Sequence, residues 1–307
     1  MKIYKILILS LLLTLSLHSD IKGDFPSYQY VFNELGVDEN YIYDRDFQKF
    51  VYQNRQKYTR RFKNAVNRGA LVIPTMRELM YQMDISPLFI YLSMVESAFK
   101  TEAKSTSAAG GLWQFMPTSG REQHLRIDSF IDERYDPIKS TRAAVDYLYK
   151  IRGGLDKWYL AAMAYNCGQG CVQRAVKKAG TKHLSTLLDP RRAYLRTETR
   201  KYIKKILLFA LIGENYLFKR NDNFGAMIYR FNNDRITSVR LRSRERLNQI
   251  ASKLQINYST LKKINMHLKQ EFIPQNSNAM LNIPTSRLSK FNQVYGGQRR
   301  ADIRYYR

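Results

Sequence analysis

Glu96 is the carboxyl group best placed in this sequence to exchange a proton near neutral pH. It falls on the apolar face of a helix predicted over 86–99, with Ser86 a suitable N-cap and Pro87 a suitable first residue. The other members of that face recur at spacings of three and four residues: Ile85, Phe89, Leu92 and Phe99. Desolvation raises the pKa of a carboxyl group, and a protonated carboxyl group is what a general acid needs. The alternative is a structural ion pair between Glu96 and an Arg or Lys side chain.

Other polar and aromatic side chains follow in three segments, 110–117, 164–168 and 198–203. The amide of Gln114 offers a donor and an acceptor for a hydroxyl or N-acetyl group. We expect its neighbours Trp113 and Phe115 to lie in the core. Ser97 follows the acid and has two possible roles, a hydrogen bond to substrate or to Glu96, or a bond back to its own helix.

Helices must position these side chains, because the pattern from 73 to 218 is helical almost throughout. We predict helices over 141–152, 158–165, 172–178 and 197–218, separated by glycines. No strongly alternating strand pattern precedes Arg235. The predicted fold class is therefore mainly α, with a helical domain over 73–220 after a helical N-terminal extension over 20–72.

A second unit begins near Ile236. A β-like run over 236–241 precedes two helical segments, and 280–284 is a short strand that ends at a proline. This order predicts a small βααβ domain over 236–285, followed by a basic tail over 286–307. From 236 to the end there are 14 Lys+Arg and 3 Asp+Glu, so this part carries +11 of the total charge.

Composition narrows the class of protein. A length of 307 residues with 44% hydrophobic residues fits about two folded domains and excludes wholesale disorder. Two cysteines, Cys167 and Cys171, exclude a disulfide-stapled miniprotein and a cysteine-rich zinc fold. The formal charge is 51 − 26, or +25, which attracts anionic partners: nucleic acid, a membrane surface or an acidic wall polymer.

The N-terminus predicts export. Lys2 and Lys5 precede an apolar run over 6–17 that is short for a membrane span, and small residues follow near Ser19. This is typical of a secretory signal peptide, here 1–19, with an uncleaved anchor as the alternative. No cysteine lies nearby, so we expect a periplasmic protein that is not a lipoprotein, and nucleic acid becomes an unsuitable partner. An oxidising compartment permits a disulfide between the two cysteines, with two thiols as the alternative.

In order and spacing, Glu96-Ser97 and the three later segments resemble the signature blocks of lysozyme-like lytic transglycosylases. They are most similar to the membrane-bound lytic murein transglycosylase D group, over roughly 73 to 213. The resemblance implies a lysozyme-like catalytic domain that cleaves the β-1,4 bond between N-acetylmuramic acid and N-acetylglucosamine in peptidoglycan. Glycan strands would then be its partner, with an anionic membrane surface as a second possibility.

The same resemblance assigns roles to single residues. It implies that Glu96 is the catalytic acid and that the Tyr202 hydroxyl lies close to it. A core aromatic role is the alternative for Tyr202. It also implies that Tyr165 and Asn166 bind sugar, and that Met116 lines a sugar subsite unless it fills the core.

The implied reaction needs one carboxylate and neither metal nor cofactor. Glu96 would protonate the bridging oxygen as an oxocarbenium-like centre forms. The 6-hydroxyl of the same sugar would then attack its anomeric carbon, and the Glu96 carboxylate would take the hydroxyl proton, giving a 1,6-anhydro product. The carboxylates between the blocks are expected to be solvated or structural: Glu102, Asp128, Asp132, Glu133 and Asp136. A lysozyme-like hydrolytic muramidase and a non-catalytic wall-binding scaffold are the alternative functions.

The segment 236–284 resembles a LysM domain, which implies binding of wall glycan. It keeps the frame of that family: Leu247, Ile250, Ala251, Leu261, Asn265 and Ile283-Pro284. It has Arg244-Glu245 where a Gly-Asp pair is usual. The catalytic blocks depart from their family at three positions, with Ala108 for glycine, Gly110 for alanine and Lys204 for proline.

Overall fold

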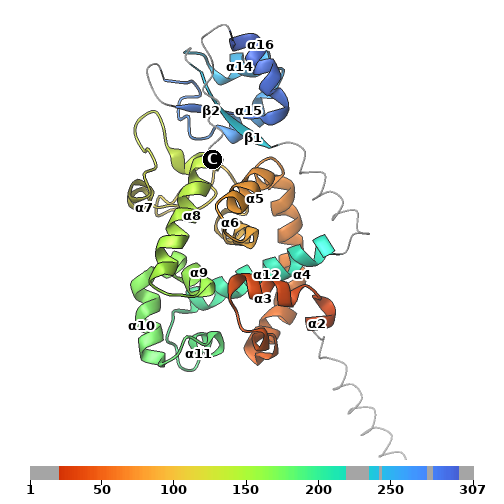
Figure 1. Cartoon of the computed structure of the whole chain (residues 1–307), viewed down its shortest axis with the longest axis vertical. Helices are drawn as coiled ribbons and strands as arrows, with labels where there is room; N and C mark the ends of the chain where they lie inside the picture. Colours follow the sequence, from red (N-terminus) through yellow and green to blue (C-terminus); the bar gives the residue numbers. More distant parts are fainter. Residues whose placement is uncertain (1–20, 219–234, 242–243, 275–278, 297–307) are drawn as a thin grey trace, which may run out of the picture.

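The structure is a computed structural model, and it describes residues 21–218, 235–241, 244–274 and 279–296. The predicted signal peptide over 1–19 and the end of the predicted tail, 297–307, lie outside the described residues. Figure 1 shows a larger helical part and, at one end, a small part with two strands and helices. The predicted fold class, mainly α with a small βααβ domain, is confirmed.

The N-terminal extension is helical. It consists of α2 (Ile21–Asp24), α3 (Tyr28–Leu35), the 3₁₀ helix η1 (Glu39–Tyr43) and α4 (Arg45–Gly69). The Asp44 carboxylate begins α4 by accepting a hydrogen bond from the Phe47 N–H at 2.8 Å. Phe47, Val51 and Tyr58 are buried on one face of α4, so the extension shares one core with the helices that follow.

The main helical domain contains every helix predicted for it. Its elements are α5 (Ile73–Gln82), η2 (Pro87–Phe89), α6 (Ile90–Ser97), α7 (Pro117–Glu122), η3 (Glu133–Tyr135), α8 (Pro137–Gly153), α9 (Trp158–Cys167), α10 (Gln169–Ala179), α11 (Leu184–Leu188) and α12 (Thr197–Phe218). α8 begins earlier than predicted because the Asp136 carboxylate caps it and Pro137 is its first residue. Within the described residues, no helix is both long enough and apolar enough to cross a membrane.

α12 is the central helix of this domain. α3, α4, α6 and α9 pack against it, and its residues Ile203, Leu207 and Leu211 are fully buried. Tyr202 reaches α6, whereas Lys204 reaches the start of α4 and forms an ion pair with Asp46 there. Residues two positions apart on an α-helix point about 200° away from each other, so Tyr202 and Lys204 lie on opposite sides of α12.

A disulfide closes the turn between α9 and α10. Cys167 ends α9 and Cys171 lies in the first turn of α10, with their Cα atoms 5.9 Å apart. Gly168 between them has φ +84°, a conformation that glycine adopts readily. Of the two alternatives that the sequence leaves open, the structure therefore contains the disulfide.

The small domain has the predicted order of elements. β1 (Ile236–Arg240) pairs antiparallel with β2 (Met280–Pro284), and α14 (Leu247–Leu254) and α15 (Tyr258–Ile264) lie between them in sequence. Asn265 is 1% exposed and its Nδ2 donates to the carbonyls of Leu261 (2.8 Å) and Asn282 (2.7 Å). Asn265, a residue of the predicted LysM frame, thus forms a polar link between α15 and β2.

The predicted basic tail over 286–307 is wrong for its first part. After the 3₁₀ helix η5 (Thr285–Arg287), the chain forms α16 (Leu288–Tyr295). Phe291 and Tyr295 are four residues apart and are 1% and 7% exposed in the core of the small domain. The helical spacing of these apolar residues determines the structure here, and the basic residues around them do not prevent the helix.

Candidate active site

Glu96 lies in the last turn of α6, a helix buried on almost all sides. Leu92 and Met94 before it are 0% and 3% exposed. The chain turns sharply after the acid, because Ala98 and Phe99 have φ values of +50° and +58°. The predicted apolar neighbours of Glu96 are all buried: Ile85, Phe89, Leu92 and Phe99.

Burial raises the pKa of the Glu96 carboxyl from 4.5 to about 7. The hydrogen bond from Tyr202 and the positive charge of Lys205 lower that pKa, and the charge of Glu198 raises it, but desolvation is the largest cause. The carboxyl group therefore exists in both protonation states near neutral pH. Its hydrogen-bond partner is a phenol and not a cation, so the structure does not have the structural ion pair that was the alternative.

Tyr202 supplies that hydrogen bond. Its hydroxyl donates to Oε1 of Glu96 at 2.5 Å, and its side chain is 4% exposed on α12. Burial, and next the charge of Glu96, raise the pKa of Tyr202 well above 10. The phenol therefore stays protonated and can serve as a permanent donor beside the acid.

Ser97 and Gln114 both make internal hydrogen bonds. The Ser97 hydroxyl donates to the Leu112 carbonyl at 2.9 Å and accepts from the Phe99 N–H at 3.1 Å. Gln114 Nε2 donates to the carbonyls of Gly111 (2.9 Å) and Ala103 (3.2 Å). Both side chains thus fix the loop over 103–116, which we call the active-site loop, and of the Gln114 amide the oxygen is the atom best placed to accept from a ligand.

Tyr165 and Asn166, at the end of α9, connect the active-site loop to α12. The Tyr165 hydroxyl donates to the Trp113 carbonyl at 2.8 Å, and the charge of Glu96 is one cause of the raised pKa of Tyr165, after burial. Oδ1 of Asn166 accepts from the Thr199 hydroxyl at 2.9 Å. Tyr165 therefore lies close enough to Glu96 to be affected by its charge, and Asn166 binds the first turn of the helix that carries Tyr202.

The remaining predicted residues of the active-site loop divide between core and surface. Trp113 and Phe115 are 0% and 3% exposed, as expected for core residues, and Trp113 Nε1 donates to the Thr141 hydroxyl at 2.9 Å. Met116 is 42% exposed. An apolar side chain this exposed does not fill the core, and a place for Met116 at a sugar subsite stays a prediction.

The carboxylates between the blocks are structural where they are buried. Asp132, Glu133 and Asp136 are 4%, 6% and 1% exposed and accept hydrogen bonds from backbone or side-chain donors. The sequence-based expectation of one carboxylate omits Glu198, an exposed residue in the first turn of α12 whose charge reaches Glu96. Its position four residues before Tyr202, on the same face of one helix, was the available signal.

The three departures from the family pattern have structural correlates. Ala108 has φ +66°, a conformation in which glycine is less strained. A Cβ atom on Gly110 would lie 2.7 Å from the Tyr135 hydroxyl, so this loop has no room for alanine there. Lys204 is 6% exposed and pairs with Asp46, which joins α12 to the N-terminal extension.

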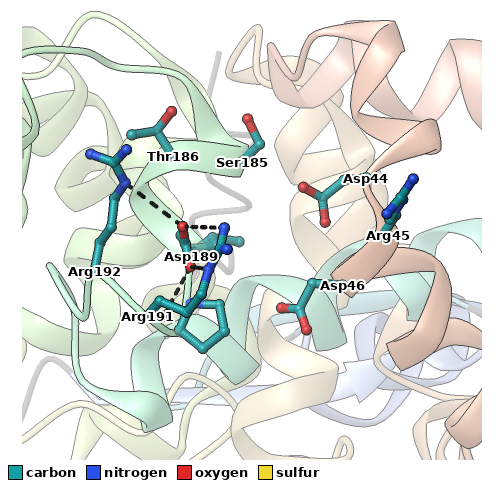
Figure 2. A pocket seen from close by; sticks show the side chains of 10 residues that line it. Asp44, Arg45, Asp46, Ser185, Thr186, Asp189, Arg191 and Arg192 are labelled. Carbon is teal, nitrogen blue, oxygen red and sulfur yellow. Dashed lines mark hydrogen bonds and ion pairs between the residues drawn. The ribbon is translucent and has the colours of Figure 1, made fainter.

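A polar pocket of about 650 Å³ lies between the start of α4 and the segment 185–192. Figure 2 shows Arg191 and Arg192 directed at Asp189, with Asp44 and Asp46 on the facing wall. None of the predicted site residues lines it. Among the described residues, no group of three or more His, Cys, Asp or Glu side chains is arranged to hold a metal ion.

Comparison with protein families assigns the two domains separately. The family described as Transglycosylase SLT domain matches residues 75–187, and the family described as Lytic transglycosylase MltD, LysM-like domain matches residues 235–298. The first match includes Glu96 and ends before Tyr202. The second includes α16, in agreement with the place of that helix in the small domain.

Individual proteins are also similar to this chain. Membrane-bound lytic murein transglycosylase D of Escherichia coli (strain K12) is 29% identical over 264 residues, covering 82% of this chain and 54% of that protein. A putative tributyltin chloride resistance protein of Alteromonas sp. (strain M-1) is 36% identical over 92 residues, covering 30% and 44%. The chain therefore spans about half the length of the curated relatives it matches.

Among solved structures, an inactive mutant of the lytic transglycosylase Slt from Pseudomonas aeruginosa is similar. It has a TM-score of 0.37 and 25% identity, over 46% of this chain and 23% of that one. Taken with the sequence blocks and the Glu96–Tyr202 pair, the two family matches identify the chain as one with an SLT transglycosylase domain followed by an MltD-type LysM domain.

Proposed function

We propose that this protein is a peptidoglycan lytic transglycosylase that cleaves the β-1,4 bond between N-acetylmuramic acid and N-acetylglucosamine. The observation that carries the proposal is Glu96, a desolvated carboxyl group with a pKa of about 7, held by the Tyr202 hydroxyl at 2.5 Å inside an SLT domain. Such a group can give a proton and take one back at the same pH.

The first step uses the protonated form of Glu96. Its proton passes to the bridging oxygen as the bond to the anomeric carbon of the muramic acid breaks and positive charge develops on the sugar ring. The glycan leaves with a new hydroxyl group, and Glu96 becomes a carboxylate. Tyr202 can stabilise this carboxylate, because its phenol already donates to Oε1.

The second step uses the carboxylate. Glu96 takes the proton of the 6-hydroxyl as that oxygen bonds to the anomeric carbon, so the acid is regenerated and no water is consumed. The product ends in a 1,6-anhydro ring. Ser97, Gln114, Met116, Tyr165 and Asn166 would form or support the sugar subsites around these steps.

Hydrolysis is the second candidate, and Glu198 is the observation that favours it. Glu198 is a second acidic group whose charge reaches Glu96, and a hydrolase uses a second carboxylate to activate water or stabilise the cation. The decisive experiment is mass spectrometry of muropeptides after incubation with purified sacculi. Products lighter by one water support transglycosylation, products with a reducing end support hydrolysis, and an intact wall supports a non-catalytic scaffold.

We further propose that the protein acts outside the cytoplasm and that its LysM-like domain holds it on wall glycan. The predicted signal peptide over 1–19 and the Cys167–Cys171 disulfide support export, since disulfides persist in oxidising compartments. The charge of +25 supports attraction to acidic wall polymer or to an anionic membrane surface, and does not require nucleic acid. Fractionation of cells with an antibody against the chain tests the location.

A further inference from the structure

The LysM-like domain contacts the helical domain at several points, among them the hydrogen bonds from the Ile236 N–H to Thr75 and from Lys263 to the Arg68 carbonyl. The contact that leads to the active site is made by residues 126–136, which we call the bridging segment. Ile131 of this segment is 0% exposed and belongs to the core of the LysM-like domain. Backbone bonds flank it on both sides: the Asp132 N–H donates to the His267 carbonyl (2.9 Å), and the Lys269 N–H donates to the Phe130 carbonyl (3.0 Å). A residue of one domain thus completes the core of the other.

Buried polar groups fix the same contact. Asp136 is 1% exposed, and its Oδ2 accepts from Asn282 Nδ2 at 3.2 Å and lies 3.6 Å from Nδ1 of His267. His267 and Asn282 are 2% and 0% exposed. Separating the domains is costly here, because Asp136 and Asn282 would each lose a buried hydrogen bond. The contact therefore has the character of a domain interior and not of a loose linker.

Arg134 carries this contact to the active-site loop. Its side chain is 7% exposed, and its Nε and Nη2 donate to the Asp132 carboxylate at 2.9 and 2.7 Å. Its Nη1 donates to the carbonyls of Ala108 (2.7 Å) and Phe115 (3.0 Å). One guanidinium group therefore ties two points of the active-site loop to the bridging segment.

The active-site loop needs such support because of its backbone. Ala108, Gly111 and Gln114 all have positive φ values, +66°, +76° and +50°. For Ala108 and Gln114 this conformation is sparsely populated and persists only where the surroundings impose it. The same loop presents the carbonyl of Leu112 to Ser97, next to Glu96, and the carbonyl of Trp113 to Tyr165.

We propose that the LysM-like domain is a structural part of the active site, and that Arg134 is the positioning residue through which its docking holds the active-site loop against Glu96. The proposal rests on the proposed function for its kinetic readout. It differs from a wall-anchoring role, because it requires an effect on short soluble glycans that need no anchoring.

The first test is Arg134→Lys in the full chain, with soluble glycan oligomers as substrate. Lysine keeps the charge but cannot reach Asp132, Ala108 and Phe115 together. We expect kcat to fall about 10- to 100-fold, as for a displaced positioning group, with a smaller change in KM. Hydrogen exchange of the Gly110 and Gly111 amides should accelerate while that of α12 stays slow, and the emission of Trp113 should change. Unchanged kcat and unchanged exchange would overturn the proposal.

The second test places the change on the docking side. Ile131→Ala weakens the docking of the LysM-like domain without changing a residue of the active-site loop, and Phe291→Leu, on α16 in the same core, is the matched control. We expect Ile131→Ala to lower kcat about fivefold in the wild-type chain but less than about twofold in Arg134→Lys, because both act through one route. The control should leave kcat unchanged. Additive effects, or an equal loss in the control, would contradict coupling through Arg134.

A replacement variant and a readout that needs no activity allow the two proposals to fail independently. If Arg134→Lys does not fold, Asp132→Asn replaces it in the same measurements, since Asp132 orients the guanidinium group. If the wild-type protein releases no product from any glycan, the proposed function fails. The hydrogen exchange of Gly110 and Gly111 in Ile131→Ala, compared with Phe291→Leu, then still decides whether docking holds the active-site loop.

Discussion

The phenol O–H of Tyr202 donates a hydrogen bond to Oε1 of Glu96, although the two residues are 106 positions apart in the chain. The two residues lie on α12 and α6, which pack against each other in the centre of the helical domain. Because both elements are buried, their relative position is set by the core and not by surface loops. The acid and its hydrogen-bond donor are therefore prearranged before any substrate arrives.

Glu96→Gln should abolish lysis and preserve the fold. The amide is nearly isosteric and can still accept from Tyr202, but it cannot give up or take a proton. Loss of a general acid costs about 10²- to 10⁴-fold in rate. Turnover of purified sacculi is the measurement, with circular dichroism as the control for folding, and near-normal turnover would refute the assignment of Glu96.

The same variant should change how stability depends on pH. In the wild type, the folded pKa of Glu96 is raised from 4.5 to about 7, so its contribution to stability is complete below about pH 4.5 and is lost as pH rises through 7. This amounts to about 3 kcal/mol. Glu96→Gln lacks this loss, so the stability difference between variant and wild type should shift in favour of the variant between pH 5 and pH 8. Denaturant unfolding at both pH values measures it, and equal differences at both would contradict a raised pKa.

Tyr202→Phe should lower turnover and shift the pH profile. The bond from Tyr202 lowers the pKa of Glu96, so its loss should raise that pKa further and move the alkaline limb of kcat/KM to higher pH. The ring still packs, so the melting temperature should change little. A pH–rate profile with thermal denaturation tests this. Full activity with an unshifted limb would mean that Tyr202 is a core aromatic only.

The ion pair between Lys204 and Asp46 should respond unequally to removal of its two members. The Lys204 side chain is 8% exposed and that of Asp46 is 48% exposed. Asp46→Ala leaves a buried cation unpaired and should cost about 3 kcal/mol. Lys204→Met leaves a carboxylate that water can reach, and should cost less than about 1 kcal/mol. Denaturant unfolding gives both values, and the opposite order would show that packing and not charge decides this contact.

Retention on the wall should depend on salt. The part of the chain from 236 onward carries +11, and exposed charges are screened over about 10 Å at 0.1 M salt. The fraction of full-length protein that pellets with sacculi should fall as salt rises, while an uncharged polysaccharide should retain little at any salt. Retention independent of ionic strength would assign wall binding to contacts other than charge.

The sequence predicted what depends on local periodicity. The apolar stripe around Glu96 was sufficient to predict a raised pKa, because burial of one face of a helix follows from spacings of three and four residues. The same rule would have found α16, since Leu288, Phe291 and Tyr295 have that spacing within the segment that its basic surroundings assigned to a tail. Where the local charge and the spacing of the apolar residues disagree, the apolar spacing predicts the structure better.

Contacts between distant segments were not predictable in this way. Ser97 donates a hydrogen bond to the Leu112 carbonyl and Gln114 donates one to the Ala103 carbonyl. Because every residue has a backbone carbonyl, the residue types do not show which carbonyl will be the acceptor. Arg134 stands in an acidic and basic run that indicates a solvated surface. Its guanidinium group is buried against Asp132 and against two carbonyls of the active-site loop, and only the tertiary structure reveals these partners.

The redox state of Cys167 and Cys171 shows whether a molecule has passed through an oxidising compartment. These are the two cysteines of the chain, so a molecule that has met an oxidising compartment offers no thiol, and one held in a reducing compartment offers two. Alkylation with a heavy maleimide would therefore separate the two populations on one gel. The proportion of unlabelled chains then measures the exported fraction of the protein, without a reporter fusion or an assay of lysis.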